Sequence, residues 1–268
     1  MNLLIKEFDI TNILNTKQCF TCMFLIHDTI YITLLNECIM VNVDTWTEEY
    51  SCHNKNESYQ LLTIHPILPY YLYENTVDRE LILCHSIEND KVMDIKGNAC
   101  YKKAKYDLFG NLFMLHMSGV LYYTCYADYG NIIKELPIYV PRISSFDLDV
   151  RHNILVCAAS DGFYIFKLVY TKKNTHIQFV MYTHKYKNDN VYVHDVGIDC
   201  ENDVLVYKSN MCLYIVYDLF NIYNYNNLTS IKESKINIRG DRFVIHSKQK
   251  KIYVYDNLKI YVYEIIKK

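Results

Sequence analysis

Short apolar segments recur along this chain in the same order and at nearly the same spacing. In the clearest copy, Asp149 is followed by apolar segments at 153–156 and 163–166, and the same features return at Asp199, 203–206 and 213–216. The first position of each copy is occupied in turn by His65, Asp107, Asp149, Asp199 and Asn237. Periods of about 40–45 residues built from short strands are typical of β-propeller blades.

Each copy contains an apolar pair, a turn, a strand, a second turn and an alternating strand. The second turns are Ser118-Gly119, 160–162 and Ser209-Asn210, in which Gly and Asn supply the positive φ of a tight hairpin. Residues 30–35 and 38–43 predict a hairpin in a first, degenerate copy, and 176–182 and 259–266 predict fourth strands. Residues 219–228 are interpreted as a loop or an outer strand, and no segment has a sustained helical period.

These elements predict an all-β fold in which residues 1–268 form a single β-propeller domain. Six blades are expected, with seven as the alternative because the amino-terminal strand could complete a further blade. One blade exposes both faces and an edge, and radial stacking covers the faces. Closure then requires the strands at 3–10 and 259–266 to be neighbours.

The copies resemble WD40-type repeats over about residues 60–256. The resemblance rests on His65-Pro66 before 70–72, on 160–162 leading into 163–166, and on Tyr217-Asp218 and Tyr255-Asp256 in the place of the Trp-Asp pair. The chain departs from the family in lacking a Gly-His pair, and its single Trp46 precedes Thr47. The resemblance implies a platform that docks proteins or RNA–protein assemblies.

Composition and charge narrow the function classes. A net charge of -2 gives no overall field that would recruit nucleic acid or anionic membrane. No apolar run has the length of a signal peptide core or of a membrane span, about 18 residues in the latter case. The ten cysteines are scattered among apolar residues, as in a reduced cytoplasmic protein. We therefore expect a soluble cytoplasmic protein with no membrane partner.

Candidate chemical sites have simpler structural interpretations. Cys19-x-x-Cys22 with His27 lacks the second ligand pair of a zinc site, so core cysteines are favoured. The recurrent turn acids could form a cation-binding ring, but Asx side chains commonly bond their own turns, and that interpretation is preferred. No metal, cofactor or small-molecule substrate is predicted.

Catalytic motifs are absent from the sequence, so the protein is predicted not to be an enzyme. The alternative is an enzyme with its active site in the propeller channel. It would require a histidine, a cysteine and a carboxylate that converge within about 3 Å in a pocket.

Basic segments between the predicted strands suggest a partner-binding surface. Their lysines are Lys102, Lys103, Lys105, Lys172, Lys173, Lys185, Lys187, Lys248, Lys250 and Lys251. The adjacent tyrosines are Tyr101, Tyr106, Tyr170, Tyr186 and Tyr253. Interleaved Lys and Tyr suit phosphate contact together with stacking on unpaired bases. The alternative is solvated loop charge balanced by acids elsewhere.

These observations predict a non-enzymatic propeller that docks on a ribosome, through its rRNA, or on another ribonucleoprotein, and occludes a functional site. The small size and A/T-biased composition are similar to those of proteins from microsporidia, which implies a dormancy factor that silences stored ribosomes. The alternative within the same class is a protein-only scaffold, such as a coat, pore or ubiquitin-ligase adaptor.

Overall fold

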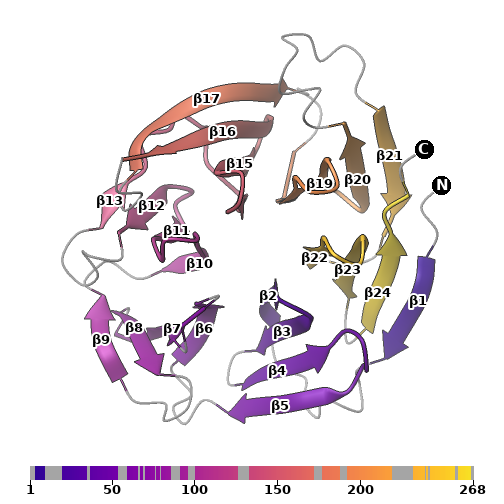
Figure 1. Cartoon of the computed structure of the whole chain (residues 1–268), viewed down its shortest axis with the longest axis horizontal. Helices are drawn as coiled ribbons and strands as arrows, with labels where there is room; N and C mark the ends of the chain where they lie inside the picture. Colours follow the sequence, from indigo (N-terminus) through magenta and orange to yellow (C-terminus); the bar gives the residue numbers. More distant parts are fainter. Residues whose placement is uncertain are drawn as a thin grey trace. The chain divides into compact units, whose positions relative to one another are not determined.

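The computed structural model describes most of the chain as short strands (Figure 1). The residues described are 4–9, 20–34, 37–53, 59–65, 67–68, 70–75, 77–78, 80–85, 91–95, 100–125, 133–171, 177–187, 192–218, 232–238, 240, 242–256 and 259–266. Within these stretches no helix is long and apolar enough to cross a membrane. The strands form six antiparallel sheets of four strands each, as expected for six blades.

The chain divides into two compact units, and the prediction of a single domain stays a prediction. Unit 1 contains Met1–Asn15, Tyr139–Val169 and Val180–Lys268, and unit 2 contains Thr16–Ile138 and Tyr170–Phe179.

Unit 2 is built around three sheets. The first contains β2 (Phe20–Ile26), β3 (Thr29–Leu34), β4 (Glu37–Asn42) and β5 (Glu48–His53). The second contains β6 (Tyr59–Ile64), β7 (Tyr70–Asn75), β8 (Glu80–His85) and β9 (Lys91–Ile95). The third contains β10 (Tyr101–Tyr106), β11 (Leu112–His116), β12 (Leu121–Thr124) and β13 (Lys134–Glu135). The predicted hairpin at 30–43 is confirmed as β3 and β4.

Unit 1 carries most of the remaining three sheets. The first contains β14 (Ser145–Asp149), β15 (Ile154–Ala159), β16 (Gly162–Tyr170) and β17 (Ile177–Lys187). The second contains β18 (Asp195–Asp199), β19 (Val204–Ser209), β20 (Cys212–Tyr217) and β21 (Lys232–Asn237). The third is ordered β1 (Leu4–Asp9), β24 (Lys259–Glu264), β23 (Lys251–Asp256) and β22 (Arg242–His246).

Two second strands, β15 and β19, are buried along their whole length. All six residues of β15 and all six residues of β19 are buried, although successive side chains point to opposite faces of a sheet. Both faces of each strand must therefore be covered by neighbours. A shared apolar cluster joins Val156 and Ile165 to Ile198 and Leu205 of the next sheet. Within each unit, adjacent sheets thus pack face to face.

The amino-terminal strand completes the last sheet. β1 pairs antiparallel with β24, with Phe8 opposite Ile260 and Asp9 opposite Lys259 (Figure 1). The expectation that 3–10 and 259–266 are neighbours is confirmed. Because β1 supplies the fourth strand of the sixth sheet, it does not begin a seventh.

The last repeat was assigned one strand out of place from the sequence. Asn237 ends β21, the fourth strand of the preceding sheet, and the first strand of the last sheet is β22, which ends at His246. Residues 259–264 are consequently third, not fourth, in their sheet. Likewise Tyr217 ends a third strand whereas Tyr255 lies in a second strand, so their Tyr-Asp pairs are not equivalent. A template with four consecutive strands fails here because the fourth strand comes from the other end of the chain.

The turn chemistry within the repeats is confirmed. Gly119, Gly162 and Asn210 have φ values of 88°, 132° and 52°. The fourth strand predicted at 176–182 falls within β17, while 219–228 lies outside the described residues. Cysteines pack as small apolar residues, since Cys38, Cys84, Cys125, Cys157 and Cys200 are buried. Cys19 lies outside the described residues, and His27 is exposed in the turn after β2.

Close packing between two sheets of unit 1 can be tested at Gly197 in β18. A Cβ added there would lie 2.9 Å from Cε2 of Phe243 and 3.0 Å from Cδ1 of Ile245 in β22. We expect Gly197→Val to lower the free energy of unfolding by about 1–3 kcal/mol because of overpacking. Urea denaturation measures this. The double variant with Ile245→Val should recover part of the loss, and costs that simply add would contradict the contact.

Candidate functional site

The turn after the first strand is built alike in four sheets. Its anchor residues are His65, Asp107, Asp149 and Asp199, which end or follow β6, β10, β14 and β18. Nδ1 of His65 accepts a hydrogen bond from the Leu68 amide at 3.0 Å, and Oδ1 of Asp199 accepts one from the Asn202 amide at 3.2 Å. The anchor therefore satisfies the N–H groups of its own turn, which confirms the structural interpretation of these four positions.

Asp107 is a buried acidic anchor that directly follows β10 in unit 2. Its Oδ1 accepts hydrogen bonds from the Phe109 and Asn111 amides, each at 2.8 Å. Its Oδ2 accepts bonds from Nδ2 of Asn111 and from the hydroxyl of Tyr170, also at 2.8 Å. Burial raises the pKa of Asp107, and these hydrogen bonds only partly offset that effect. Both oxygens of the carboxylate therefore accept two hydrogen bonds each, three from the turn and one from Tyr170 of β16.

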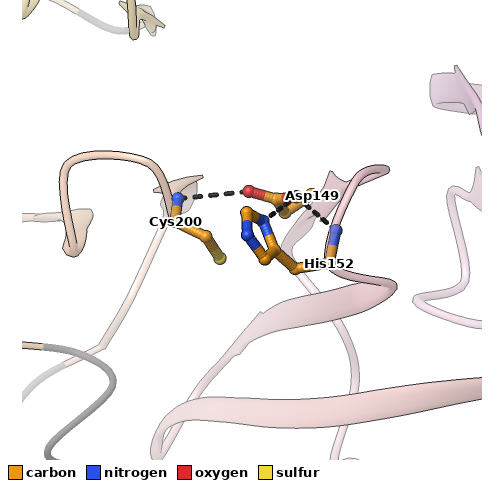
Figure 2. A group of neighbouring side chains, drawn as sticks. All are labelled: Asp149, His152 and Cys200. Carbon is orange, nitrogen blue, oxygen red and sulfur yellow. Dashed lines mark hydrogen bonds and ion pairs between the residues drawn. The ribbon is translucent and has the colours of Figure 1, made fainter.

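Asp149, His152 and Cys200 converge in unit 1 (Figure 2). Asp149 ends β14 and His152 lies in the turn that follows it, while Cys200 directly follows β18 of the next sheet. Oδ1 of Asp149 lies 2.9 Å from Nδ1 of His152, and Oδ2 accepts the Cys200 amide at 3.1 Å. One ligand atom from each side chain lies within 4.8 Å of the other two. This donor set can hold a metal ion.

The charged side chains that act on the Cys200 thiol are carboxylates. Burial raises the pKa of the Cys200 thiol, and the charges of Asp149, Asp199 and Asp147 raise it further. Burial also acts to raise the pKa of Asp149, but hydrogen bonds from the His152 backbone and from Cys200 outweigh it, so the net pKa is lowered. Asp149 is therefore ionised and the thiol protonated at neutral pH.

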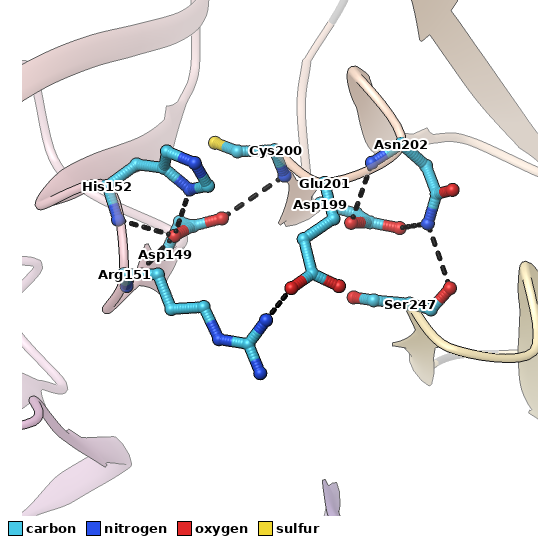
Figure 3. A network of polar contacts seen from close by, with 8 residues as sticks. All are labelled: Asp149, Arg151, His152, Asp199, Cys200, Glu201, Asn202 and Ser247. Carbon is cyan, nitrogen blue, oxygen red and sulfur yellow. Dashed lines mark hydrogen bonds and ion pairs between the residues drawn. The ribbon is translucent and has the colours of Figure 1, made fainter.

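An ion pair and hydrogen bonds connect neighbouring turns of unit 1 around this cluster (Figure 3). Arg151 forms an ion pair with Glu201 of the next turn, and both side chains are exposed. Nδ2 of Asn202 donates to Oδ2 of Asp199 at 2.7 Å and to the Ser247 carbonyl at 2.8 Å. The exposed ion pair contributes little to stability, whereas the partly buried amide of Asn202 links the turn after β18 to the turn after β22 of the next sheet.

Sequence reasoning did not find this cluster. It treated Asp149 and Asp199 as equivalent turn residues and considered a cation-binding ring made of the anchors. The structure instead brings Asp149 together with His152, three residues later, and with Cys200, which follows Asp199. The available signal was the pair Asp149 and His152 together with Cys200 directly after Asp199. That combination becomes meaningful only when adjacent sheets are placed side by side.

The predicted lysines are only partly described. Lys172 and Lys173 lie outside the described residues, and Lys185 and Lys187 lie in β17 with side chains that are not described. The remaining residues belong to different units: Lys102, Lys103 and Lys105 to unit 2, and Lys248, Lys250 and Lys251 to unit 1.

Six of the lysines assigned to loops lie in strands instead, namely Lys102, Lys103, Lys105, Lys185, Lys187 and Lys251. Lys102, Lys103 and Lys105 lie in strand β10, because Tyr101, Ala104 and Tyr106 give that segment a buried face. The turn after β22 does carry Lys248 and Lys250, as predicted, and Lys251 begins β23.

The tyrosines beside these lysines do not form a base-stacking surface. Tyr101, Tyr106 and Tyr253 are buried, and the ring of Tyr101 packs edge-on against Tyr122 with centroids 6.2 Å apart. Tyr170 is half-buried and bonded to Asp107. The expectation that these four tyrosines stack on unpaired bases is corrected, because their rings cover the core. The Tyr186 side chain is not described.

The fold is shared with a solved structure of low sequence similarity. The β-propeller domain of Cps50 (Swd1) from Myceliophteria thermophila superposes with a TM-score of 0.69 at 12% identity, covering 99% of this chain and 100% of that one. No protein-family model matches the sequence. No curated protein matches it either. The chain is therefore an all-β protein with the β-propeller fold and six blades, as predicted.

The bond between Tyr170 and Asp107 makes a pH-dependent prediction. A raised folded-state pKa means that Asp107 lowers stability as pH rises through its ordinary pKa toward the folded value. Tyr170→Phe removes a donor to the ionised form, so it should raise this pKa further and lower the free energy of unfolding by about 1.5–3 kcal/mol at neutral pH.

Chemical denaturation at several pH values measures the effect of Tyr170→Phe. The loss should shrink in acid, where Asp107 is protonated. Tyr139→Phe is the control, because Tyr139 is fully exposed and its change should be close to zero. A loss that is the same at all pH values would contradict an interaction with the carboxylate.

Proposed function

We propose that this protein is a non-enzymatic docking platform that binds a partner protein through the turns after the first strands of its sheets. The observation that carries the proposal is the exposure of large apolar side chains in two such turns of unit 2. Ile67 is 71% exposed, Leu108 47% and Phe109 37%. Apolar side chains presented together in this way are typical of protein-binding surfaces.

The two turns lie at the same end of unit 2. Their anchors His65 and Asp107 follow β6 and β10, and the ring of His65 packs on that of Tyr106 with centroids 4.7 Å apart. The third apolar residue, Phe109, is held by an edge contact with Tyr170 at 5.0 Å. The turns are thus rigid where they leave the sheets, which lowers the entropy lost on binding.

An enzyme would require a cysteine, a histidine and a carboxylate that converge. Cys200, His152 and Asp149 fulfil part of that requirement, since their ligand atoms lie within 4.8 Å of one another. Cys200 is only 3% exposed, and the acidic surroundings that raise its pKa oppose the thiolate that a nucleophile requires. The cluster of Asp149, His152 and Cys200 therefore favours metal binding over nucleophilic catalysis.

The apolar turn surface can be tested with charged substitutions. Ile67→Glu with Leu108→Glu should abolish recovery of the partner when the tagged whole protein is purified from its own cells. The matched control is Val77→Glu with Met117→Glu, in the turns at the opposite ends of the same sheets, where exposure is 72% and 57%. Both variants should keep the wild-type Tm. A partner lost equally from both, or from neither, would contradict the proposal.

In a narrower form of the proposal, the partner is a ribosome or another ribonucleoprotein. The protein would bind the ribosome through its rRNA and act as a dormancy factor. Its remaining support is the set of lysines, of which Lys102, Lys103 and Lys105 lie close together on β10. Buried tyrosines remove the stacking component, so binding would depend on phosphate contacts alone.

Salt dependence tests this narrower form. If each lysine contacts a phosphate, Lys102→Gln, Lys103→Gln and Lys105→Gln together should reduce the slope of log affinity against log salt by about 2–3 in co-sedimentation with ribosomes. Lys248→Gln, Lys250→Gln and Lys251→Gln form the comparison set. Failure to co-sediment, or binding that ignores salt, would leave a protein-only partner.

A further inference from the structure

We infer that Asp149, His152 and Cys200 form a binding site for a divalent cation of the zinc type. The three side chains come from two adjacent sheets of unit 1 and turn their ligand atoms toward one another, all within 4.8 Å (Figure 2). The site is separate from the docking surface proposed above and does not depend on it.

The donor set indicates which cation is favoured. A thiolate, an imidazole and a carboxylate together suit Zn²⁺ or Co²⁺, whereas Ca²⁺ and Mg²⁺ require oxygen ligands. Tetrahedral coordination with bonds of about 2.0–2.3 Å places ligand atoms about 3.3–3.8 Å apart. The upper limit of 4.8 Å on the present separations exceeds that range by about 1 Å, a difference that side-chain rotation can supply.

The imidazole is already oriented for such a role. Nδ1 of His152 lies 2.9 Å from Oδ1 of Asp149, so the carboxylate fixes the orientation of the ring. In both close views the other ring nitrogen lies on the side of the ring that faces the Cys200 sulfur (Figures 2 and 3). A carboxylate that fixes the ring of a metal-binding histidine is a common arrangement. Here Oδ2 of the same carboxylate also faces the turn of Cys200.

The local charge favours a cation. Asp147 and Asp149 lie on β14 and Asp199 ends β18, so three carboxylates lie on the two strands that carry the site, and the exposed Arg151 is paired with Glu201. A divalent ion would offset this negative charge, and the thiol proton would be released to solvent as the sulfur–metal bond forms. His152 is partly exposed and Cys200 is buried, so an ion could enter from the histidine side.

Binding would join the turn after β14 to the turn after β18. Three protein ligands leave a fourth position for water or for a side chain from a partner. Because the site is formed only when the two sheets are packed together, the cation should stabilise the folded state.

The test uses the whole protein, stripped of metal with a chelator under a non-thiol reductant and titrated with Co²⁺. Wild-type protein should give the near-ultraviolet charge-transfer absorption of a Co²⁺–thiolate bond, and Zn²⁺ should abolish it and raise the Tm by several degrees. Cys200→Ser should lose the absorption. Cys212→Ser is the control, because Cys212 lies elsewhere in unit 1, on β20, and should retain it.

Absence of the charge-transfer absorption, or equal absorption in Cys200→Ser, would overturn the inference, since the chain has ten cysteines that could bind cobalt elsewhere. His152→Asn provides a second measurement if Cys200→Ser does not fold, because the histidine ring is partly exposed. It should weaken Co²⁺ affinity at least tenfold. An unchanged affinity would exclude His152 as a ligand and overturn the site.

Discussion

The strands β15 and β19 are buried on both faces, and this constraint determines how the sheets around them are arranged. β15 and β19 are buried at every position, so a sheet that contains either one cannot face water on any side. Within each unit the sheets must therefore pack against one another, and burying apolar area at about 25 cal/mol per Å² drives that packing.

The same packing forces polar groups of neighbouring sheets into contact, where they need hydrogen-bond partners. Oδ2 of Asp147 in β14 accepts the Ile198 amide of β18 at 2.9 Å, and Asp149, two residues later, accepts the Cys200 amide. Alternate residues of one strand thus satisfy alternate amides of the next, which fixes the register between the sheets. Cys200 lies beside Asp149 and His152 as a consequence of that register, whether or not a metal binds.

The sequence was sufficient to predict the repeat, the number of sheets and the pairing of the terminal strands, because apolar spacing and turn residues are local signals. It misplaced Asn237 because the fourth strand of the last sheet comes from the amino terminus, which no local pattern reveals. Similarly, Tyr101 and Tyr106 looked like a binding surface when only their neighbouring lysines were considered. Their burial depends on Tyr122 and His65, which other strands bring into contact with them.

Each turn after a first strand contains two kinds of position: an anchor residue that holds the turn, and exposed residues that differ between repeats. The anchor must accept hydrogen bonds from its own turn, which restricts it to residues such as Asp107 or His65. Some residues that follow the anchor, such as Asn111 and Asn202, also bond to it, whereas others such as Leu108 are exposed and can differ between repeats. In unit 2 they include the exposed Leu108, and in unit 1 the ligand candidates His152 and Cys200. One repeated turn can therefore carry the proposed docking surface in one unit and the proposed metal site in the other, because the anchor residue holds the turn in the same way in both.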